Sequence, residues 1–290
     1  MIHGILPVDK PLGWTSHDVV VKARRVCGQR SVGHAGTLDP LATGVLLLVL
    51  GDATRLSQYL MDTPKSYCAE VVLGATTETD DGEGSLRDLA DATHLTEANI
   101  HHCLQRFRGE IAQVPPAYAA VHHGGEKMYK LARRGVRILG PARRVQVHHL
   151  EMISWHAPRL RLRVICGSGT YIRSIARDLG SALGVGGYLH ALRRIASGTF
   201  SIRDCLPLES VSDVEAVRDN IAAPDRAVLD WPAVVLDDLG VRAVCHGQAV
   251  GLGRSHVGQV RLYDEVGHLL ALGRADGALV RPFRVFQRGP

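Results

Sequence analysis

A single aspartate, Asp39, stands in the segment of the sequence with the most unusual composition. Residues 33–44 read Gly-His-Ala-Gly-Thr-Leu-Asp-Pro-Leu-Ala-Thr-Gly, and the apolar run 45–50 follows directly. Because a residue before proline is kept away from helical backbone angles, Asp39 is expected to be extended. A short polar side chain on a loop supported by a buried strand is a common way to build a reactive site. We therefore predict a chemical role for Asp39; the alternative is an ordinary Asp-Pro turn.

The elements that position this loop follow from apolar periodicity. Residues 159–166 alternate more cleanly than the other segments, with leucine, valine and cysteine on one face and Arg159, Arg161 and Arg163 on the other, which predicts a half-solvated strand. Residues 66–73 also alternate and predict a second strand. Helical spacing predicts helices from Thr15 or Ser16 to residue 26, over 96–108, and from 172 onward after a glycine turn. Strands with irregularly placed helices indicate an α+β fold with a mixed, largely antiparallel sheet.

Two further segments differ from the rest of the chain in composition and in the pattern of their apolar residues. Residues 76–91 are acidic and contain glycine, which predicts a solvated surface loop. Beyond Pro232, residues 259–263 and 268–272 predict a hairpin around the turn 264–267, inside a small all-β module. We place the boundary near residue 235, with 209–230 as a helical lead-in.

The motif around Asp39 closely resembles the catalytic motif of bacterial TruB-type tRNA pseudouridine synthases, which isomerise uridine 55 in the T-arm of tRNA. The resemblance covers roughly residues 2–208, and five separated motifs are unlikely to co-occur by chance. The further matching segments, in the family's order, are Asp9-Lys10-Pro11-x-Gly13 with Thr15-Ser16, Lys65-x-Tyr67, Val114-Pro115-Pro116-Ala117-Tyr118, Gly167-x-Gly169-Thr170-Tyr171-Ile172-Arg173 and Leu192-Arg193-Arg194.

The resemblance implies a pseudouridine synthase catalytic domain over 1–235, with a basic tRNA-binding insertion at about 122–149. Residues 236–290 more weakly resemble a PUA module, a small β-barrel that binds RNA; the alternative is a β domain without RNA contact.

The resemblance also implies an active site. The reaction breaks the C1′–N1 glycosidic bond and rejoins the ribose to C5, which requires a carboxylate but no cofactor or metal. Asp39 is that carboxylate; attack at C1′, attack at C6 and abstraction of a sugar proton all stay open. Arg173 would pair with Asp39 and orient it. Tyr67, the third catalytic residue, stacks on the base and is a possible proton acceptor.

Substrate binding follows from the same match. Extruding a stacked base costs a few kcal/mol, which aromatic faces offset by stacking. Tyr67 and Tyr171 would supply those faces and Leu192 an apolar contact. His34 would touch the flipped nucleotide or its neighbours, and Lys10 would support the loop or a phosphate.

A basic patch lies in the expected insertion, and the resemblance implies that this patch binds the T-arm. Its members are Lys127, Lys130, Arg133, Arg134, Arg137, Arg143 and Arg144. Only Glu126 is acidic in this stretch, which favours phosphate contact over internal pairing. The family's usual Ser-Ala-x-Lys is here Ala-Ala-Val-His at 119–122, so the role of that lysine cannot be carried over to His122.

The whole chain has 290 residues, 46% of them hydrophobic, and a formal net charge of +5. This composition excludes a disordered chain, and no apolar run approaches the ~18 residues of a membrane span. The N-terminus does not resemble a signal peptide, so a cytoplasmic location is expected. We expect tRNA as the partner, a monomer, and no obligatory protein partner. The two alternatives are a subunit of a guide-RNA-dependent synthase and a non-enzymatic tRNA-folding chaperone.

Overall fold

A mixed sheet of ten strands forms the body of the molecule. The computed structural model describes residues 1–118, 122–123, 126–127 and 140–286. The main strand order is β14-β1-β3-β12-β4-β11-β10-β7, with β2 added beside β3 and β13 beside β12. Only the β1–β14 and β3–β12 pairs are parallel, which confirms the largely antiparallel α+β prediction. The strands are β1 (Gly4–Lys10), β2 (Val32–Ala35), β3 (Ala42–Leu50), β4 (Lys65–Leu73), β7 (Gly109–Gln113), β10 (Arg143–His156), β11 (Arg159–Cys166), β12 (Gly187–Ser197), β13 (Phe200–Ser201) and β14 (Leu206–Pro207).

Helices cover both faces of this sheet. The α-helices are α1 (Ser16–Cys27), α2 (Ser57–Asp62), α3 (Glu97–Leu104), α5 (Ile172–Ala182) and α6 (Val214–Asp219). The 3-10 helices are η1 (Gly51–Leu56), η2 (Gln105–Phe107), η3 (Ile202–Asp204), η4 (Leu208–Ser210) and η5 (Pro224–Val228). The predicted helices at 15–26, at 96–108 and from 172 correspond to α1, to α3 with η2, and to α5. Thr15 caps α1 by accepting a hydrogen bond from the Asp18 amide.

Two core clusters explain why residues 45–50 of β3 are all apolar. One cluster holds Leu46, Leu48 and Leu50 together with residues of α1, α3 and α5. The other holds Val45, Leu47 and Val49 together with residues of η1, α2 and η5. A strand covered on both sides has no solvent face, whereas β11 buries only its alternate residues, as predicted. The Asp39 loop therefore runs directly into the most deeply buried strand of the sheet.

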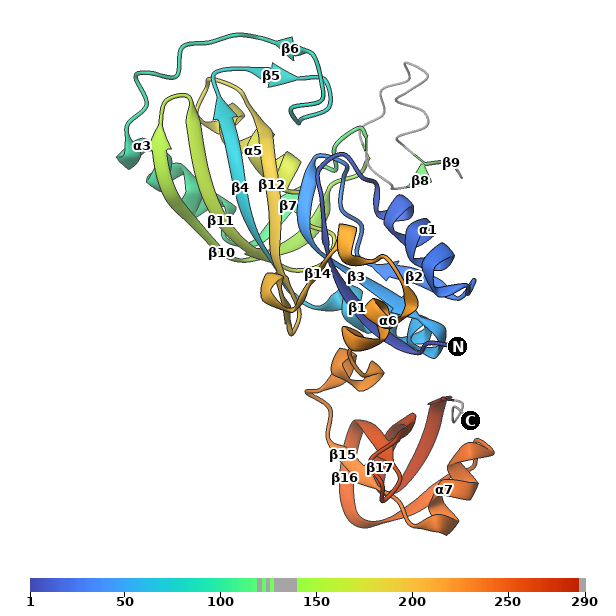
Figure 1. Cartoon of the computed structure of the whole chain (residues 1–290). Coiled ribbons are helices and arrows are strands. Elements are labelled where there is room, and N and C mark those ends of the chain that lie inside the picture. The colour runs from blue at the N-terminus through green and yellow to red at the C-terminus, as the bar shows by residue number, and fades with distance from the viewer. Residues whose placement is uncertain (119–121, 124–125, 128–139, 287–290) are drawn as a thin grey trace.

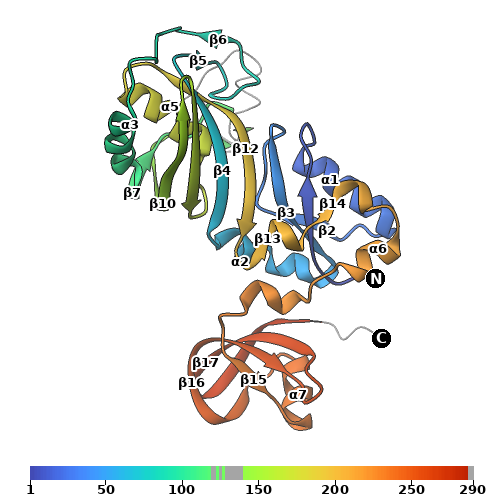
Figure 2. The same cartoon turned by 60° about the vertical axis from the view of Figure 1, so that its left-hand side comes forward.

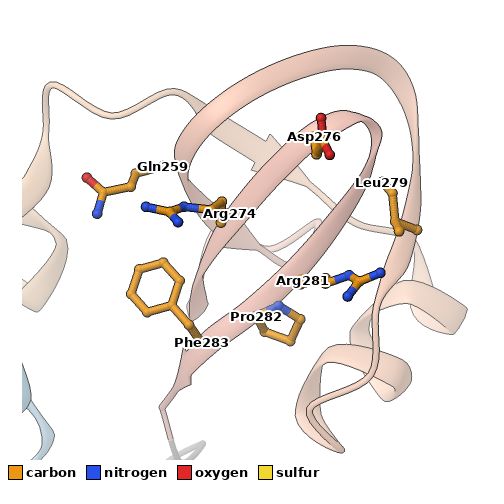
Figure 3. Close-up of a pocket in the computed structure, with 7 residues that line it drawn as sticks. All are labelled: Gln259, Arg274, Asp276, Leu279, Arg281, Pro282 and Phe283. Atoms are coloured by element: carbon orange, nitrogen blue, oxygen red, sulfur yellow. The ribbon is translucent and has the colours of Figure 1, made fainter.

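A smaller C-terminal module follows, formed by β15 (Ala233–Val235), α7 (Asp238–Cys245), β16 (Val250–Tyr263) and β17 (Leu269–Val285). The predicted hairpin is present, and β17 turns back on itself between the arms that carry Arg274 and Arg281 (Figure 3). The Phe286 amide donates to the Leu270 carbonyl at 2.9 Å and joins the arms. The expectation of an all-β module is wrong, because Asp237 caps α7 and that helix buries Val241 and Val244.

The two ends of the molecule are formed by different parts of the chain. The short pairs β5 (Thr76–Thr77) with β6 (Leu86–Arg87) and β8 (His122–His123) with β9 (Glu126–Lys127) lie at one end. The C-terminal module lies at the other, in both views (Figures 1 and 2). In the part of the chain that the structure describes, none of the helices has the length and apolar character of a bilayer span.

Candidate active site

Asp39 lies in the connection from β2 to β3 and faces an arginine of α5. We call residues 36–41 the Asp39 loop. An Asp39 carboxylate oxygen lies 2.9 Å from an Arg173 guanidinium nitrogen. The side chain of Arg173 is 6% exposed, whereas that of Asp39 is 38% exposed. The Asp39 carboxylate is therefore accessible to solvent, and the arginine that it contacts is buried.

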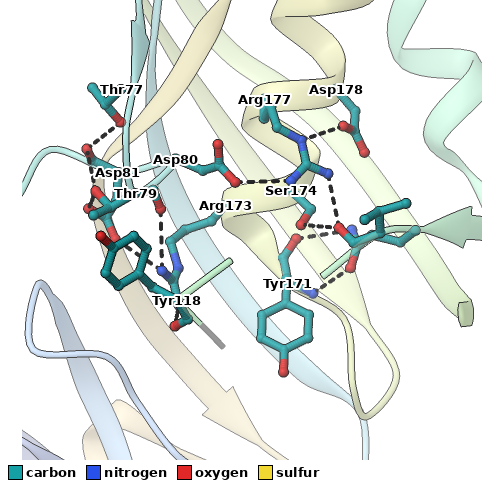
Figure 4. Close-up of polar contacts among 12 residues, drawn as sticks. Thr77, Thr79, Asp80, Asp81, Tyr118, Tyr171, Arg173, Ser174, Arg177 and Asp178 are labelled. Atoms are coloured by element: carbon teal, nitrogen blue, oxygen red, sulfur yellow. Dashed lines mark hydrogen bonds and ion pairs between the residues drawn. The ribbon is translucent and has the colours of Figure 1, made fainter. Parts of the chain in front are cut away.

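A second carboxylate holds the same arginine from behind. Asp81 lies 3.3 Å from the other terminal nitrogen of Arg173, and both side chains are almost fully buried. Arg173 also donates to the backbone carbonyls of Thr79 at 3.4 Å and Tyr118 at 3.3 Å (Figure 4). A cation at a helix N-terminus opposes the helix dipole, and Arg173 is the second residue of α5. Two carboxylates at this position offset that repulsion and fix the guanidinium plane.

The participation of Asp81 corrects the prediction that residues 76–91 form a solvated loop. The Asp81 side chain accepts hydrogen bonds from the Thr79 hydroxyl and, at 3.1 Å, from the Glu83 amide. Gly84 is required here, because a Cβ atom at that position would lie 2.6 Å from the Thr79 hydroxyl oxygen. Burial, followed by the charges of Asp81 and Asp39, raises the pKa of Glu83. The signal in the sequence was the tight spacing of threonine, aspartate and glycine between residues 77 and 84.

The N-terminal motif holds the Asp39 loop in place. The hydroxyl of Ser16, the first residue of α1, accepts from the Leu38 amide at 2.8 Å and donates to the Leu38 carbonyl at 3.0 Å. The Gly13 amide donates to the Pro40 carbonyl at 2.9 Å. Both neighbours of Asp39 are thus fixed by one short segment.

Lys10 is fully buried beneath the same loop. Its ammonium group donates to the carbonyls of Trp14 at 2.6 Å, Pro11 at 3.0 Å and Pro40 at 3.4 Å. Burial lowers the pKa of Lys10 to about 8, and the charge of Asp39 opposes that shift. The bond to Pro40 joins Lys10 to the Asp39 loop.

Arg194 of β12 supports the other side of the site. It is 1% exposed and donates to the carbonyls of Val45 at 2.6 Å and Gly36 at 3.0 Å. Gly44 allows this close approach, since a Cβ atom there would overlap the Arg194 backbone and Gly44 has a φ of +100°. The charge of Arg194 also acts on Tyr67, its cross-strand neighbour. Sequence reasoning treated this arginine as part of a motif and missed its structural role.

The two expected aromatic residues lie on neighbouring elements. Tyr67 lies on β4 directly opposite Arg194, and burial raises its pKa, while the charge of Arg194 acts to lower it. Tyr171 precedes α5, and burial likewise raises its pKa. The Gln113 side chain fixes Tyr171 by accepting from its amide at 2.8 Å and donating to its carbonyl at 3.0 Å. Both phenols are neutral at neutral pH.

Leu192 and His34 complete the set of expected residues. Leu192 pairs with Ala42, the residue at which the Asp39 loop enters β3, and lies half-buried against the main core. Its neighbour Arg193 forms an ion pair with Asp9 at 2.7 Å, which links the first and last motifs. His34 lies on β2, and burial, followed by the charge of Arg194, lowers its pKa. Among the described residues its Nδ1 atom has no hydrogen-bond partner.

The structure describes only part of the predicted basic patch. Lys130, Arg133, Arg134 and Arg137 lie outside the described residues, and Lys127 lies in β9. Arg143 and Arg144 begin β10 and are exposed. Arg144 pairs with Glu110 of β7 at 2.6 Å, so this arginine is opposed by a carboxylate far away in the sequence. Within the described ranges, no group of three or more histidine, cysteine, aspartate or glutamate side chains could hold a metal ion.

Comparisons with known proteins agree with this geometry. Residues 24–172 match the model of the TruB family pseudouridylate synthase N-terminal domain. Residues 173–230 match the tRNA pseudouridylate synthase B C-terminal domain, and residues 232–286 match the C-terminal model of pseudouridine synthase II TruB. The chain belongs to the TruB family of pseudouridylate synthases. It is accordingly an isomerase of the pseudouridine synthase class, as its motifs predict.

TruB relatives extend over nearly the whole chain. A tRNA pseudouridine synthase B from Xanthomonas axonopodis pv. citri is 44% identical over 98% of this chain and 94% of the relative. One from Trichormus variabilis is 40% identical over 99% of both chains. Among solved structures, a Cbf5-Nop10-Gar1 complex is similar with a TM-score of 0.73 and 30% identity, covering 98% of this chain and 85% of that one. The family and its fold are therefore shared over both the body and the C-terminal module.

Proposed function

We propose that this TruB-family enzyme converts uridine 55 in the T-arm of tRNA to pseudouridine, with Asp39 as the catalytic carboxylate. The observation that carries the proposal is the Asp39–Arg173 pair at 2.9 Å, in which the carboxylate is accessible and the arginine is not. A fixed cation orients the carboxylate before substrate arrives, so little reorganisation is needed during the reaction. The relatives at 40–44% identity are named tRNA pseudouridine synthase B, which supports tRNA as the substrate.

The chemistry assigned to Asp39 requires no other charged nucleophile. The carboxylate attacks C1′ or C6, or helps to remove a sugar proton, and the C1′–N1 bond breaks. The uracil then turns so that C5 joins C1′, and the bond from Asp39 to C1′ or C6 breaks, or the abstracted sugar proton returns. C5 then loses its hydrogen to solvent as a proton, and N1 takes up a proton. Arg173 acts as the positioning partner of the carboxylate throughout, because Asp81 holds its other terminal nitrogen.

The surroundings of Asp39 suit a flipped base. Tyr67 and Tyr171 provide aromatic faces on which the extruded uracil stacks, which offsets the few kcal/mol of extrusion. Leu192 provides apolar contact beside the entry of β3, and His34 offers a neutral imidazole with an unused ring nitrogen. Lys10 fixes the floor of the site through Pro40.

Basic residues outside the active site are expected to bind the rest of the tRNA. We propose that the patch from Lys127 to Arg144, together with a PUA-like C-terminal module, contacts the tRNA phosphates. The enzyme acts as a monomer in the cytoplasm and needs no other protein. The similarity to Cbf5, which was solved with Nop10 and Gar1, makes this independence worth testing. Pseudouridine formation by the purified chain on a bare tRNA transcript is the expected result, and a requirement for added proteins or a guide RNA would contradict it.

Asp39→Asn tests the catalytic assignment. The amide keeps the size of the side chain but removes the negative charge, so we expect tRNA binding within about threefold of wild type and no pseudouridine. Release of tritium from tRNA labelled at C5 of uridine measures turnover, since C5 loses its hydrogen when it joins the ribose. Asp88→Asn, in the exposed loop before α3, is the matched control. Near-normal turnover by Asp39→Asn would overturn the assignment.

A further inference from the structure

A hollow of about 560 Å³ lies on the C-terminal module, far from Asp39 along the chain. Its lining includes Arg274 and Asp276 from the first arm of β17, Arg281 and Phe283 from the second arm, and Gln259 from β16. The volume is within the ~300–1,000 Å³ that small-ligand sites occupy. It is large enough for one nucleotide.

Most side chains around this hollow are exposed. Within the described part of the chain, Arg274 and Arg281 have no hydrogen-bond or ion-pair partner, and both are exposed. Asp276 is the one carboxylate among the lining residues, so the charge of the hollow is positive. The Phe283 ring lies 6.4 Å from the Trp231 ring, between centroids, and 43% of Phe283 remains exposed beside the two arginines.

The arrangement separates an aromatic end from a second cation. Gln259 and Arg274 are cross-strand partners, and in Figure 3 their side chains extend on the side of the hollow where the Phe283 ring lies. Arg281 extends toward the opposite side, near Leu279. The aromatic face suits stacking on a base, and the amide suits hydrogen bonding to the polar edge of that base. The two separated guanidinium groups suit two successive phosphates.

We propose that this hollow binds an unpaired nucleotide of the tRNA, with its base on Phe283 and its flanking phosphates on Arg274 and Arg281. The inference rests on the proposed tRNA substrate. Thr79 and Asp81, which contact Arg173, lie between β5 and β6, at the end of the molecule opposite the C-terminal module (Figures 1 and 2). A T-arm seated at Asp39 therefore leaves the hollow to a different part of the tRNA.

Binding of two RNAs by matched variants tests the proposal. Phe283→Ala should weaken binding of full-length tRNA about 5- to 100-fold, the range for loss of one stacked base. Arg274→Ala and Arg281→Ala should each weaken it and reduce its salt slope by about 0.9. Asp276→Asn should tighten binding, because it removes the opposing charge. An isolated T-arm stem-loop should bind all four variants as wild type does, and Arg218→Ala on α6 removes an exposed arginine elsewhere as the control.

The outcomes are distinct. Unchanged binding of full-length tRNA by the arginine and Phe283 variants would overturn the proposal, as would equal weakening of the stem-loop. Self-association of the wild-type chain that these variants abolish, with tRNA binding intact, would assign the hollow to a second copy and also overturn it. Failure of the proposed function would instead appear in the wild-type chain, as absence of pseudouridine in tRNA. A cooperative melting transition in each variant shows that it folds, because every altered side chain is exposed.

Discussion

At the scale of single residues, the site depends on one arginine that two carboxylates share. Arg173 contacts Asp39 at 2.9 Å and Asp81 at 3.3 Å, and only Asp39 is open to solvent. If Asp81 were absent, Arg173 would keep its bond to Asp39 but lose the charged partner of its other terminal nitrogen. That nitrogen would retain only the Thr79 carbonyl at 3.4 Å. Asp81 is thus a positioning residue, and its contribution should appear in turnover and not in tRNA binding.

Asp81→Asn should therefore reduce kcat. Loss of a charge-assisted hydrogen bond corresponds to about 1.5–3 kcal/mol, or roughly 10- to 100-fold in rate. Stopped-flow tritium release gives kcat, and filter binding gives the affinity for tRNA, which should stay within about threefold of wild type. Asp88→Asn removes an exposed carboxylate of the same loop and should leave both unchanged. Equal turnover by the two variants would show that the negative charge of Asp81 is not needed to position Arg173.

The sequence predicted Asp39 and Arg173 but not Asp81 or the role of Arg194. Asp39 stands out because glycines and a proline restrict the loop around it. Asp81 lies in an acidic stretch whose composition matches an exposed turn, and its burial follows from contacts with Arg173 and Leu189, 92 and 108 residues later. Arg194 is buried by strand pairing, which local sequence does not encode. Both depend on contacts between distant segments.

At the scale of elements, α1 begins at the point where the Asp39 loop needs support. Thr15 and Ser16 are adjacent hydroxyl residues with different partners. Thr15 caps α1 through the Asp18 amide, whereas Ser16 bonds both backbone groups of Leu38. Thr15 therefore stabilises the start of α1, and Ser16 stabilises the Asp39 loop.

Ser16→Ala and Thr15→Ala should separate stability from activity. Removal of the Thr15 cap costs about 0.5–2 kcal/mol, and leaving the buried Leu38 groups unpaired costs about 1–3 kcal/mol. Both variants should lower the urea midpoint. Only Ser16→Ala should lower kcat, by about 10- to 100-fold, since a small displacement of Asp39 misaligns the reaction. A comparable loss of kcat in Thr15→Ala would mean that general destabilisation, and not loop support, explains the effect.

Elements with strong periodicity were predictable, and those formed by short or weak patterns were not. β11 spans the residues predicted for it because arginines and apolar residues alternate from Arg159 to Val164. α7 was missed because its eight residues include Gly240 and two valines, which favour turns and strands when read locally. Its helix forms because the buried face packs against β16 and β17, a contact that the sequence alone does not show.

At the scale of the whole molecule, the C-terminal module and the body share a core. Leu272 and Phe286 of the module belong to the same buried cluster as Val45 and Leu47 of β3. Trp231 packs edge-on against Tyr59 of α2 at 5.0 Å between ring centroids. The change to short predicted strands and turns near residue 235 predicted a separate module. It did not predict this contact, because periodicity gives the buried face of each strand but not the surface that covers it.

The shared core makes the unfolding of the two parts one event. Phe286 is buried against the side of β3 opposite the main core, so Phe286→Ala should cost about 3–5 kcal/mol and lower the melting temperature of the whole chain by roughly 5–15 °C. Phe283→Ala alters a ring of β17 that is 43% exposed and should lower the melting temperature far less. Calorimetry should give one transition for both variants, with equal calorimetric and van't Hoff enthalpies. A separate low-temperature transition in Phe286→Ala, with the main transition unmoved, would instead show that β3 is stable without the module.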